Sequence, residues 1–307
     1  MFKFELYNNR MQVALTSYMR PELTSACLEN LLKISGVSGI HVFIDGPRHS
    51  AGMDELMWRK KTIEVCTQFA TENSKIFLKV WDRNIGLEEN SKRCFTPLFE
   101  KYKWLAVTEE DVMLTQDSIN FLKSQAATSK PGLVTSYSLA SHKSTDVISR
   151  TTLFPQLWGA AYSSEIFEGS LRVRSVNKID EKVVQESINR FFSKPSHFRN
   201  RLKSHWLWYF NYALRTHRHP DVLLQYASWE QGVFGTAPLL PLSRDISYRD
   251  WRGMNIRHNS SATAVHTSNL KKLGPANFCL NCEFESSRIE VNSMKHYWKF
   301  IKRKFEN

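Results

Sequence analysis

The feature that most constrains the fold is an alternation of strand and helix patterns over the first third of the chain. Short apolar runs rich in β-branched and aromatic residues are typical of buried strands, and longer runs with apolar residues at helical spacing separate them. The predicted strands cover residues 11–17, 40–44, 75–81 and 104–108. The predicted helices cover residues 21–32, 53–72 and 89–101. Repeated strand–helix–strand units predict an α/β fold with a mostly parallel sheet flanked by helices.

Polar segments directly follow all four predicted strands. They are residues 17–20, 45–48, 82–84 and 109–111. The carboxyl ends of parallel strands meet at one edge of a sheet, and ligands of such folds bind beyond that edge. The sequence therefore predicts a polar ligand site there.

The last of these segments is an acidic triplet, Glu109, Glu110 and Asp111. Adjacent carboxylates repel one another, and desolvation at the end of an apolar strand adds to the cost, so something must neutralise them. Mg²⁺ or Mn²⁺ prefers oxygen ligands and often takes one or two carboxylates plus phosphates and waters. We predict Asp111 as the metal ligand, with Glu109 and Glu110 shaping the site and contacting a sugar. A solvated acidic turn is the alternative.

Four segments of the chain, VALTSYMRP, VFIDGPR, DRNIGL and VTEEDVML, occur together in a recognisable order. Over residues 11–125 their order and spacing resemble the GT-A-fold glycosyltransferases of the family-two-like type, many of them bacterial polysaccharide enzymes. The acidic triplet resembles the Glu-Asp-Asp variant of that family's DXD motif, with Glu110 at the middle position. The resemblance implies a nucleotide-diphosphate sugar as donor, a UDP- or GDP-sugar, and a divalent cation as cofactor.

The resemblance also implies donor-binding residues in the first half of the chain. They are Thr16, Tyr18, Arg20, Asp45, Arg48, Asn84 and Gly86. A carboxylate such as Asp45 accepts hydrogen bonds from a base or ribose, and the guanidinium of Arg48 suits phosphate. A turn-forming role before Gly-Pro is the alternative for Asp45.

Two further segments resemble the family more loosely. Residues 157–161 resemble its Trp-Gly-Trp-Ala element, which implies that Trp158 lies against the donor sugar; core packing is the alternative. Residues 255–266 resemble its Asn-Ile-Gly…Thr-His element, which makes His266 a candidate metal or diphosphate contact. His258 competes for that role.

An inverting transfer requires a carboxylate that takes the proton of the acceptor hydroxyl. Ser228-Trp229-Glu230 is the likeness of the family's Trp-Asp pair, so Glu230 is the first candidate for this base. Asp221 is the second. A retaining reaction stays open. The sequence also predicts a polar, basic helical stretch over about residues 180–203, followed by an aromatic cluster.

We expect one continuous fold with a nucleotide-sugar-binding half (1–125), an acceptor-binding and catalytic half (126–275) and a basic C-terminal extension (276–307).

The formal net charge of +12 favours polyanionic partners. Residues 295–305, read as a helix, could lie on an anionic membrane, which suits a surface-polysaccharide or lipid-linked glycan acceptor. A solvated basic helix is the alternative. No run approaches the roughly 20 apolar residues of a membrane span. We therefore expect a cytoplasmic protein, peripheral at most on the inner face of the membrane.

Three other functions compete with this interpretation. A nucleic-acid-binding protein could use the basic surface and nine tryptophans for stacking. A glycosyltransferase acting on modified DNA would combine both properties. A nucleotidyltransferase would be expected to carry a Gly-rich phosphate loop near the first strand, and the sequence has none there.

Overall fold

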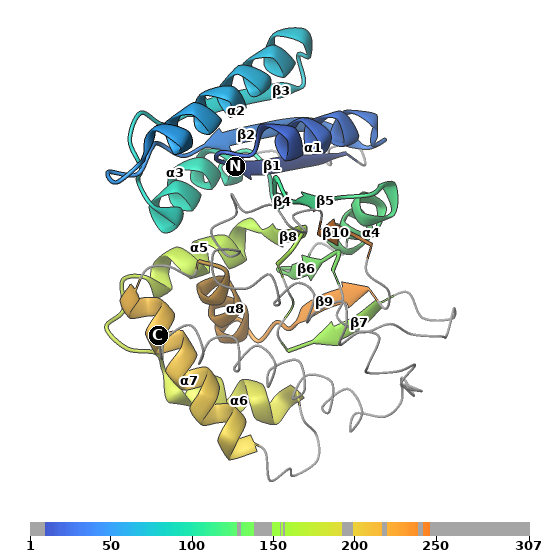
Figure 1. The fold of residues 1–307 in the computed structure, drawn as a ribbon. Helices are drawn as coiled ribbons and strands as arrows, with labels where there is room; N and C mark the ends of the chain where they lie inside the picture. The colour runs from blue at the N-terminus through green and yellow to red at the C-terminus, as the bar shows by residue number, and fades with distance from the viewer. Residues whose placement is uncertain are drawn as a thin grey trace, which may run out of the picture.

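The computed structural model describes residues 10–127, 130–137, 149–153, 155, 157–191, 199–216, 220–238 and 242–245. Eight strands form one sheet in the order β3-β2-β1-β4-β8-β6-β9-β7 (Figure 1). The elements of the first half are β1 (Met11–Ser17), α1 (Pro21–Lys33), β2 (Val37–Ile44), α2 (Met53–Glu72), β3 (Ile76–Val80), α3 (Leu87–Phe99), β4 (Trp104–Glu109), β5 (Val112–Met113) and α4 (Gln116–Ala126). Every strand and helix predicted in this half is present, with ends that differ by at most three residues.

The first four large strands are parallel, and β1 lies between β2 and β4. The chain builds outward from β1 through β2 to β3, then returns to place β4 on the other side of β1. The strand order therefore reverses between β1 and β4. In open α/β sheets this reversal opens a crevice at the carboxyl ends of the strands, where ligands bind. The predicted α/β class is confirmed.

The second half of the chain extends the same sheet. Its elements are β6 (Leu133–Thr135), β7 (Ser149–Thr152), β8 (Ala160–Ser163), α5 (Ser164–Val173), α6 (Glu181–Phe191), α7 (Arg199–Thr216), α8 (Pro220–Glu230), β9 (Gly235–Pro238) and β10 (Arg244–Asp245). The strand β8 lies antiparallel between β4 and β6, whereas β6 and β9 are parallel. The short strand β10 pairs with β5. One sheet thus joins the two predicted halves.

Helices cover both faces of the sheet (Figure 1). On one face, apolar residues of α1, α2 and α4 pack on alternate residues of β1 and β2. On the other face, α3, α5 and Leu224 of α8 pack on Ala14, Phe43 and Leu105. Side chains at alternate strand positions point to opposite faces, so burial on both faces accounts for the nearly continuous apolar strands.

The helical stretch predicted over residues 180–203 is described in two parts, both of them helical. The helix α6 ends at Phe191 and α7 begins at Arg199, while residues 192–198 lie outside the described residues. The predicted aromatic cluster lies within α7. Its Trp206 and Phe210 pack on Trp229 of α8, which buries this face of the helix.

Several predictions fall on residues that the structure does not describe. They concern His258, His266, the extension 276–307 and the basic run 295–305. Within the described part of the chain, no helix is both long and apolar enough to cross a membrane. The three cysteines described there, Cys27, Cys66 and Cys94, are buried free thiols.

Candidate functional site at the β1–β4 junction

The carboxyl ends of β1 and β4 lie side by side. Thr16 is the register partner of Glu109, and the backbone N–H of Glu110 donates to the Thr16 carbonyl at 3.1 Å. This parallel pairing places the acidic triplet next to the segment that follows β1. Residues that are about ninety positions apart in sequence meet here because the strand order reverses between these strands.

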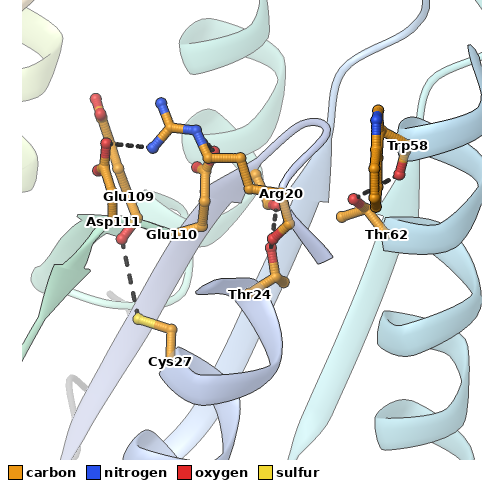
Figure 2. A network of polar contacts seen from close by, with 9 residues as sticks. Arg20, Thr24, Cys27, Trp58, Thr62, Glu109, Glu110 and Asp111 are labelled. Atoms are coloured by element: carbon orange, nitrogen blue, oxygen red, sulfur yellow. Dashed lines mark hydrogen bonds and ion pairs between the residues drawn. The ribbon is translucent and has the colours of Figure 1, made fainter. Parts of the chain in front are cut away.

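Arg20 pairs with two of the three carboxylates of the triplet. Its Nη1 donates to Oδ2 of Asp111 at 2.6 Å, and its Nε lies 3.6 Å from Oε1 of Glu110 (Figure 2). The Arg20 and Asp111 side chains are only 10% and 18% exposed. The start of α1 fixes this arginine: Pro21 occupies the first helical turn, where it is favourable, and the Thr24 hydroxyl donates to the Arg20 carbonyl at 2.8 Å. A residue predicted for the nucleotide pocket therefore also holds the triplet.

The carboxylates of Asp111 and Glu110 nevertheless change the pKa of Glu109 more than the guanidinium of Arg20 does. The Glu109 side chain is exposed to solvent on one side, but the protein around it removes part of its hydration. This partial desolvation, together with the charges of Asp111 and Glu110, raises its pKa to about 8. Arg20 lowers that pKa, and a fourth carboxylate, Asp221, raises it further. The junction is thus a strongly acidic site that attracts a proton or another cation.

The two candidate bases lie at opposite ends of α8. Asp221 is in its first turn and acts electrostatically on Glu109, as described above. Glu230 is its last residue, about 13 Å away along the helix axis. Burial and the charge of Asp180 raise the pKa of Glu230, while Tyr226 and Arg172 lower it. Among described residues, no member of the acidic triplet contributes to that shift.

A second polar cluster lies between β1 and the start of α2. Glu55, which is buried, accepts hydrogen bonds from the Tyr18 hydroxyl and from Nε of Arg48, the latter at 3.0 and 3.1 Å. The backbone N–H of Arg48 donates to the Tyr18 hydroxyl at 3.2 Å. Burial and the Glu55 carboxylate raise the pKa of Tyr18 to about 12, so this phenol stays protonated. The cluster joins two predicted donor-binding residues, Tyr18 and Arg48.

Asp45 joins the loops that follow β2 and β3. Its Oδ1 accepts from the N–H groups of Gly46 and Ile85 at 2.7 and 3.1 Å, and its Oδ2 accepts from the Asn84 amide at 2.9 Å. The Asn84 side chain in turn accepts from the N–H of Gly86 at 3.2 Å. The three predicted residues Asp45, Asn84 and Gly86 are therefore brought together, and the turn-forming role of Asp45 is present in the structure.

Sequence reasoning missed Glu55 and Arg59. Arg59 donates to the backbone carbonyls of Asp45 and Trp81 at 2.8 and 2.7 Å, which ties together the ends of β2 and β3. Glu55 and Arg59 are four residues apart in α2, and Thr62 and Cys66 continue the same buried face. This i, i+4 spacing on an otherwise polar helix is the signal that could have identified them.

Trp158 lies in a turn beside the second half of the sheet. Its ring contacts Tyr137 edge-on at 5.0 Å, and its carbonyl accepts from the Ser243 hydroxyl at 3.2 Å. Gly159 follows with a φ of 68°, a left-handed conformation that glycine adopts without strain. The half-buried ring keeps both predicted roles open, core packing and contact with a donor.

The donor set at the junction fits a hard divalent cation only in part. Within the described residues, no three His, Cys, Asp or Glu side chains are grouped so as to hold a metal ion. Carboxylate oxygens are the ligands that Mg²⁺ and Mn²⁺ prefer, and Asp111 offers one beside the solvent-reached Glu109. Such a cation would therefore draw its remaining ligands from phosphate oxygens and water.

Comparison with known proteins gives distant structural likenesses. No family model matches the sequence, and no curated protein is significantly similar to it. The chain is similar to TarS from S. aureus, solved also with UDP-GlcNAc, with 10% identity over 52% of this chain and a TM-score of 0.36. The match spans about half of the TarS chain, 48%. The mannosyltransferase PcManGT from Pyrobaculum calidifontis, solved with GDP-Man and Mn²⁺, matches over 98% of this chain and 89% of its own, with 11% identity and a TM-score of 0.41. A 4-diphosphocytidyl-2C-methyl-D-erythritol synthase from Anaerococcus prevotii matches over 64% and 83%, with 9% identity and a TM-score of 0.34.

Proposed function

We propose that the protein is a glycosyltransferase that moves a sugar from a nucleotide-diphosphate sugar to an acceptor hydroxyl. One observation carries the proposal: Glu109, Glu110, Asp111 and Arg20 converge at the reversal of strand order, with Asp221 within electrostatic reach. That position is where an α/β sheet of this topology binds a nucleotide. Its mixture of carboxylates and a guanidinium suits sugar hydroxyls and a diphosphate better than it suits a bare polyanion.

We assign the donor's nucleoside to the side of the junction formed by Asp45, Asn84 and the Tyr18–Glu55–Arg48 cluster. Both groups lie at the carboxyl edge of the parallel strands, and their hydrogen bonds fix the loops that would frame a base and ribose. The diphosphate would then lie towards Arg20 and Asp111. Asp111, with Glu109 beside it, would hold a Mg²⁺ or Mn²⁺ ion. Such an ion, when bound, would supply positive charge to the leaving diphosphate.

We assign the proton transfer to Asp221 rather than to Glu230. In an inverting reaction the base takes the acceptor's hydroxyl proton while the oxygen bonds to the anomeric carbon and the bond from that carbon to the diphosphate breaks. The base must lie near the diphosphate end of the donor. Asp221 is the candidate whose charge acts on the junction, and Glu230 is a full helix length away.

The first test is a thermal-shift screen of UDP, GDP and their sugars, with and without Mn²⁺. A ligand at about one hundred times its Kd should stabilise the folded protein by about 2.7 kcal/mol. The second step measures nucleoside diphosphate released from the stabilising sugar donor in the presence of glycan acceptors. Release of pyrophosphate from a nucleoside triphosphate would instead identify a nucleotidyltransferase. A shift only with single-stranded DNA or RNA would favour a nucleic-acid-binding protein.

A further inference from the structure

The amino-terminal half of α2 exposes an apolar patch. Met53, Leu56 and Met57 are 81%, 40% and 43% exposed. They make up three of the seven large apolar side chains that stand exposed among the described residues, and they fall within five consecutive positions. Residues at i, i+3 and i+4 share one helix face, so the three side chains form a single surface, which we call the α2 patch.

Two lysines extend the α2 patch along the helix. Lys60 and Lys61 follow Met53 by seven and eight positions, which is two turns, and both are exposed. Lys60 forms a solvent-exposed ion pair with Glu64, at 3.8 Å, and Lys61 lies over the Trp58 ring at 4.4 Å. Exposed ion pairs of this kind contribute little and exchange readily with other anions. The outer face of α2 is therefore apolar at its start and carries two lysines one turn later, with Glu64 paired to the first of them.

The α2 patch lies at the same edge of the sheet as the candidate site. The helix α2 begins after the loop that carries Asp45 and Arg48, and its Glu55 contacts Arg48 from the buried face. Leu87, which is 50% exposed, begins α3 after the neighbouring loop at the same edge. Hydrogen bonds between Asn84 and Asp45 join these two loops. A flat surface that met the α2 patch would thus face the rim of the site.

We propose that the α2 patch docks the protein on a bilayer that contains anionic lipid. Met53, Leu56 and Met57 enter the region between headgroups and acyl chains, and Lys60 and Lys61 bind lipid phosphates while their stems lie along the interface. Charge complementarity supports this partner, because both lysines and the net charge of +12 have the sign that an anionic surface attracts. The inference does not depend on the proposed transferase activity. It differs from the contact predicted for residues 295–305, since it rests on another part of the chain.

The test is co-sedimentation of the full-length protein with vesicles of phosphatidylcholine alone or of phosphatidylcholine mixed with phosphatidylglycerol. The wild-type protein should bind the mixed vesicles in a salt-sensitive manner. The triple variant Met53→Ser, Leu56→Ser, Met57→Ser should bind about tenfold more weakly or worse, because it loses apolar area at the interface. The variant Lys60→Gln, Lys61→Gln should lose about fivefold for each lysine.

Phe77→Ser provides the matched control. Phe77 is 53% exposed near the amino end of β3, away from the site edge, so this variant should bind as the wild type does. Thermal melts of every variant show whether it is folded. Binding of the folded triple variant at the wild-type level would overturn the proposal and assign the contact to another segment, such as residues 295–305. A wild-type dimer in sedimentation velocity that the triple variant converts to monomer would identify the patch as a self-association surface and would also overturn it.

Discussion

Arg20 and the proposed divalent cation would use the same carboxylate. In the protein alone Arg20 is paired with Asp111 and Glu110, and the cation would need Asp111 as its ligand. A pair of charges this close and this poorly exposed is screened little by solvent. The cation and Arg20 therefore compete for Asp111, and the energy of the ion pair is subtracted from the cation's affinity.

Replacing Arg20 should therefore strengthen binding of Mn²⁺. We expect Arg20→Met to bind free Mn²⁺ about tenfold more tightly than the wild type, because a positive charge next to the ligand is removed. Electron paramagnetic resonance of unbound Mn²⁺ measures this directly. Arg93→Met is the control, since Arg93 forms an exposed pair with Glu89 within α3. Unchanged or weaker Mn²⁺ binding in folded Arg20→Met would show that Asp111 is not the ligand.

The choice between the two bases is a second prediction at the residue scale. Asp221→Asn should lower kcat by about 10²–10⁴, the usual contribution of general-base catalysis. Glu230→Gln should retain nearly wild-type kcat, because Glu230 lies at the far end of α8. Steady-state kinetics with the identified donor separate the two. The reverse pattern would restore Glu230 as the base.

The raised pKa of Glu109 gives a pH-dependent prediction. A carboxyl whose pKa is higher in the folded state than in the unfolded state holds its proton more tightly when folded. The stability that this group contributes is therefore present below its unfolded pKa and is lost as pH rises towards about 8. Glu109→Gln keeps the neutral form, so its Tm should exceed that of the wild type at pH 8, and the difference should shrink towards pH 5. Melting curves over this range decide the matter, and a difference independent of pH would refute the assignment.

At the scale of elements, the site depends on how closely two loops approach. A Cβ built on Gly46 would lie 1.9 Å from the backbone carbonyl carbon of Arg83, so only glycine allows the loops after β2 and β3 to meet. We expect Gly46→Ala to destabilise the protein by about 1–3 kcal/mol, as overpacking does, and to weaken nucleotide binding. Gly52→Ala is the control, because a Cβ at Gly52 meets no atom within 4 Å. Chemical denaturation measures both, and equal stability of the two variants would contradict the close approach.

The elements of the first half could be predicted because their signals are local. Each parallel strand is an apolar run followed by polar residues. Pro21 marks the start of α1, and Gly36 follows its end, directly before β2. The second half lacks such signals. Its strands β6, β8 and β9 are three or four residues long, and their pairing depends on contacts that are distant in sequence. Periodicity alone could not place β8 between β4 and β6.

The site residues divide in the same way. The sequence alone predicted that Arg20 and Asp111 are polar residues just after strands. It also predicted that both lie at the same edge of the sheet. The sequence could not predict their direct ion pair, because it joins residues 91 positions apart and depends on which strands are neighbours. The same applies to Asp221, whose place near Glu109 is set by the packing of α8 against α5 and the sheet.

At the scale of the whole molecule, one sheet carries both proposed halves, and the candidate site lies where they join. The strands β1–β4 supply the acidic triplet and the loops we assign to the nucleotide, and α8 from the second half supplies Asp221. The division into donor and acceptor halves thus remains a proposal about function rather than about separate folding units. The proposed acceptor is a polysaccharide or a lipid-linked glycan. Binding to vesicles would favour the lipid-linked acceptor, but it would not identify it.

The central claim is that the carboxylates after β4 hold a cation against a diphosphate. The most direct measurement is a crystal structure with Mn²⁺ and whichever of UDP or GDP stabilises the protein, with the metal located by its anomalous scattering. We predict the manganese peak between a carboxylate oxygen of Asp111 and the diphosphate, at the junction of β1 and β4. A nucleotide bound elsewhere, or one bound at the junction while Asp111 contacts only Arg20, would contradict the claim.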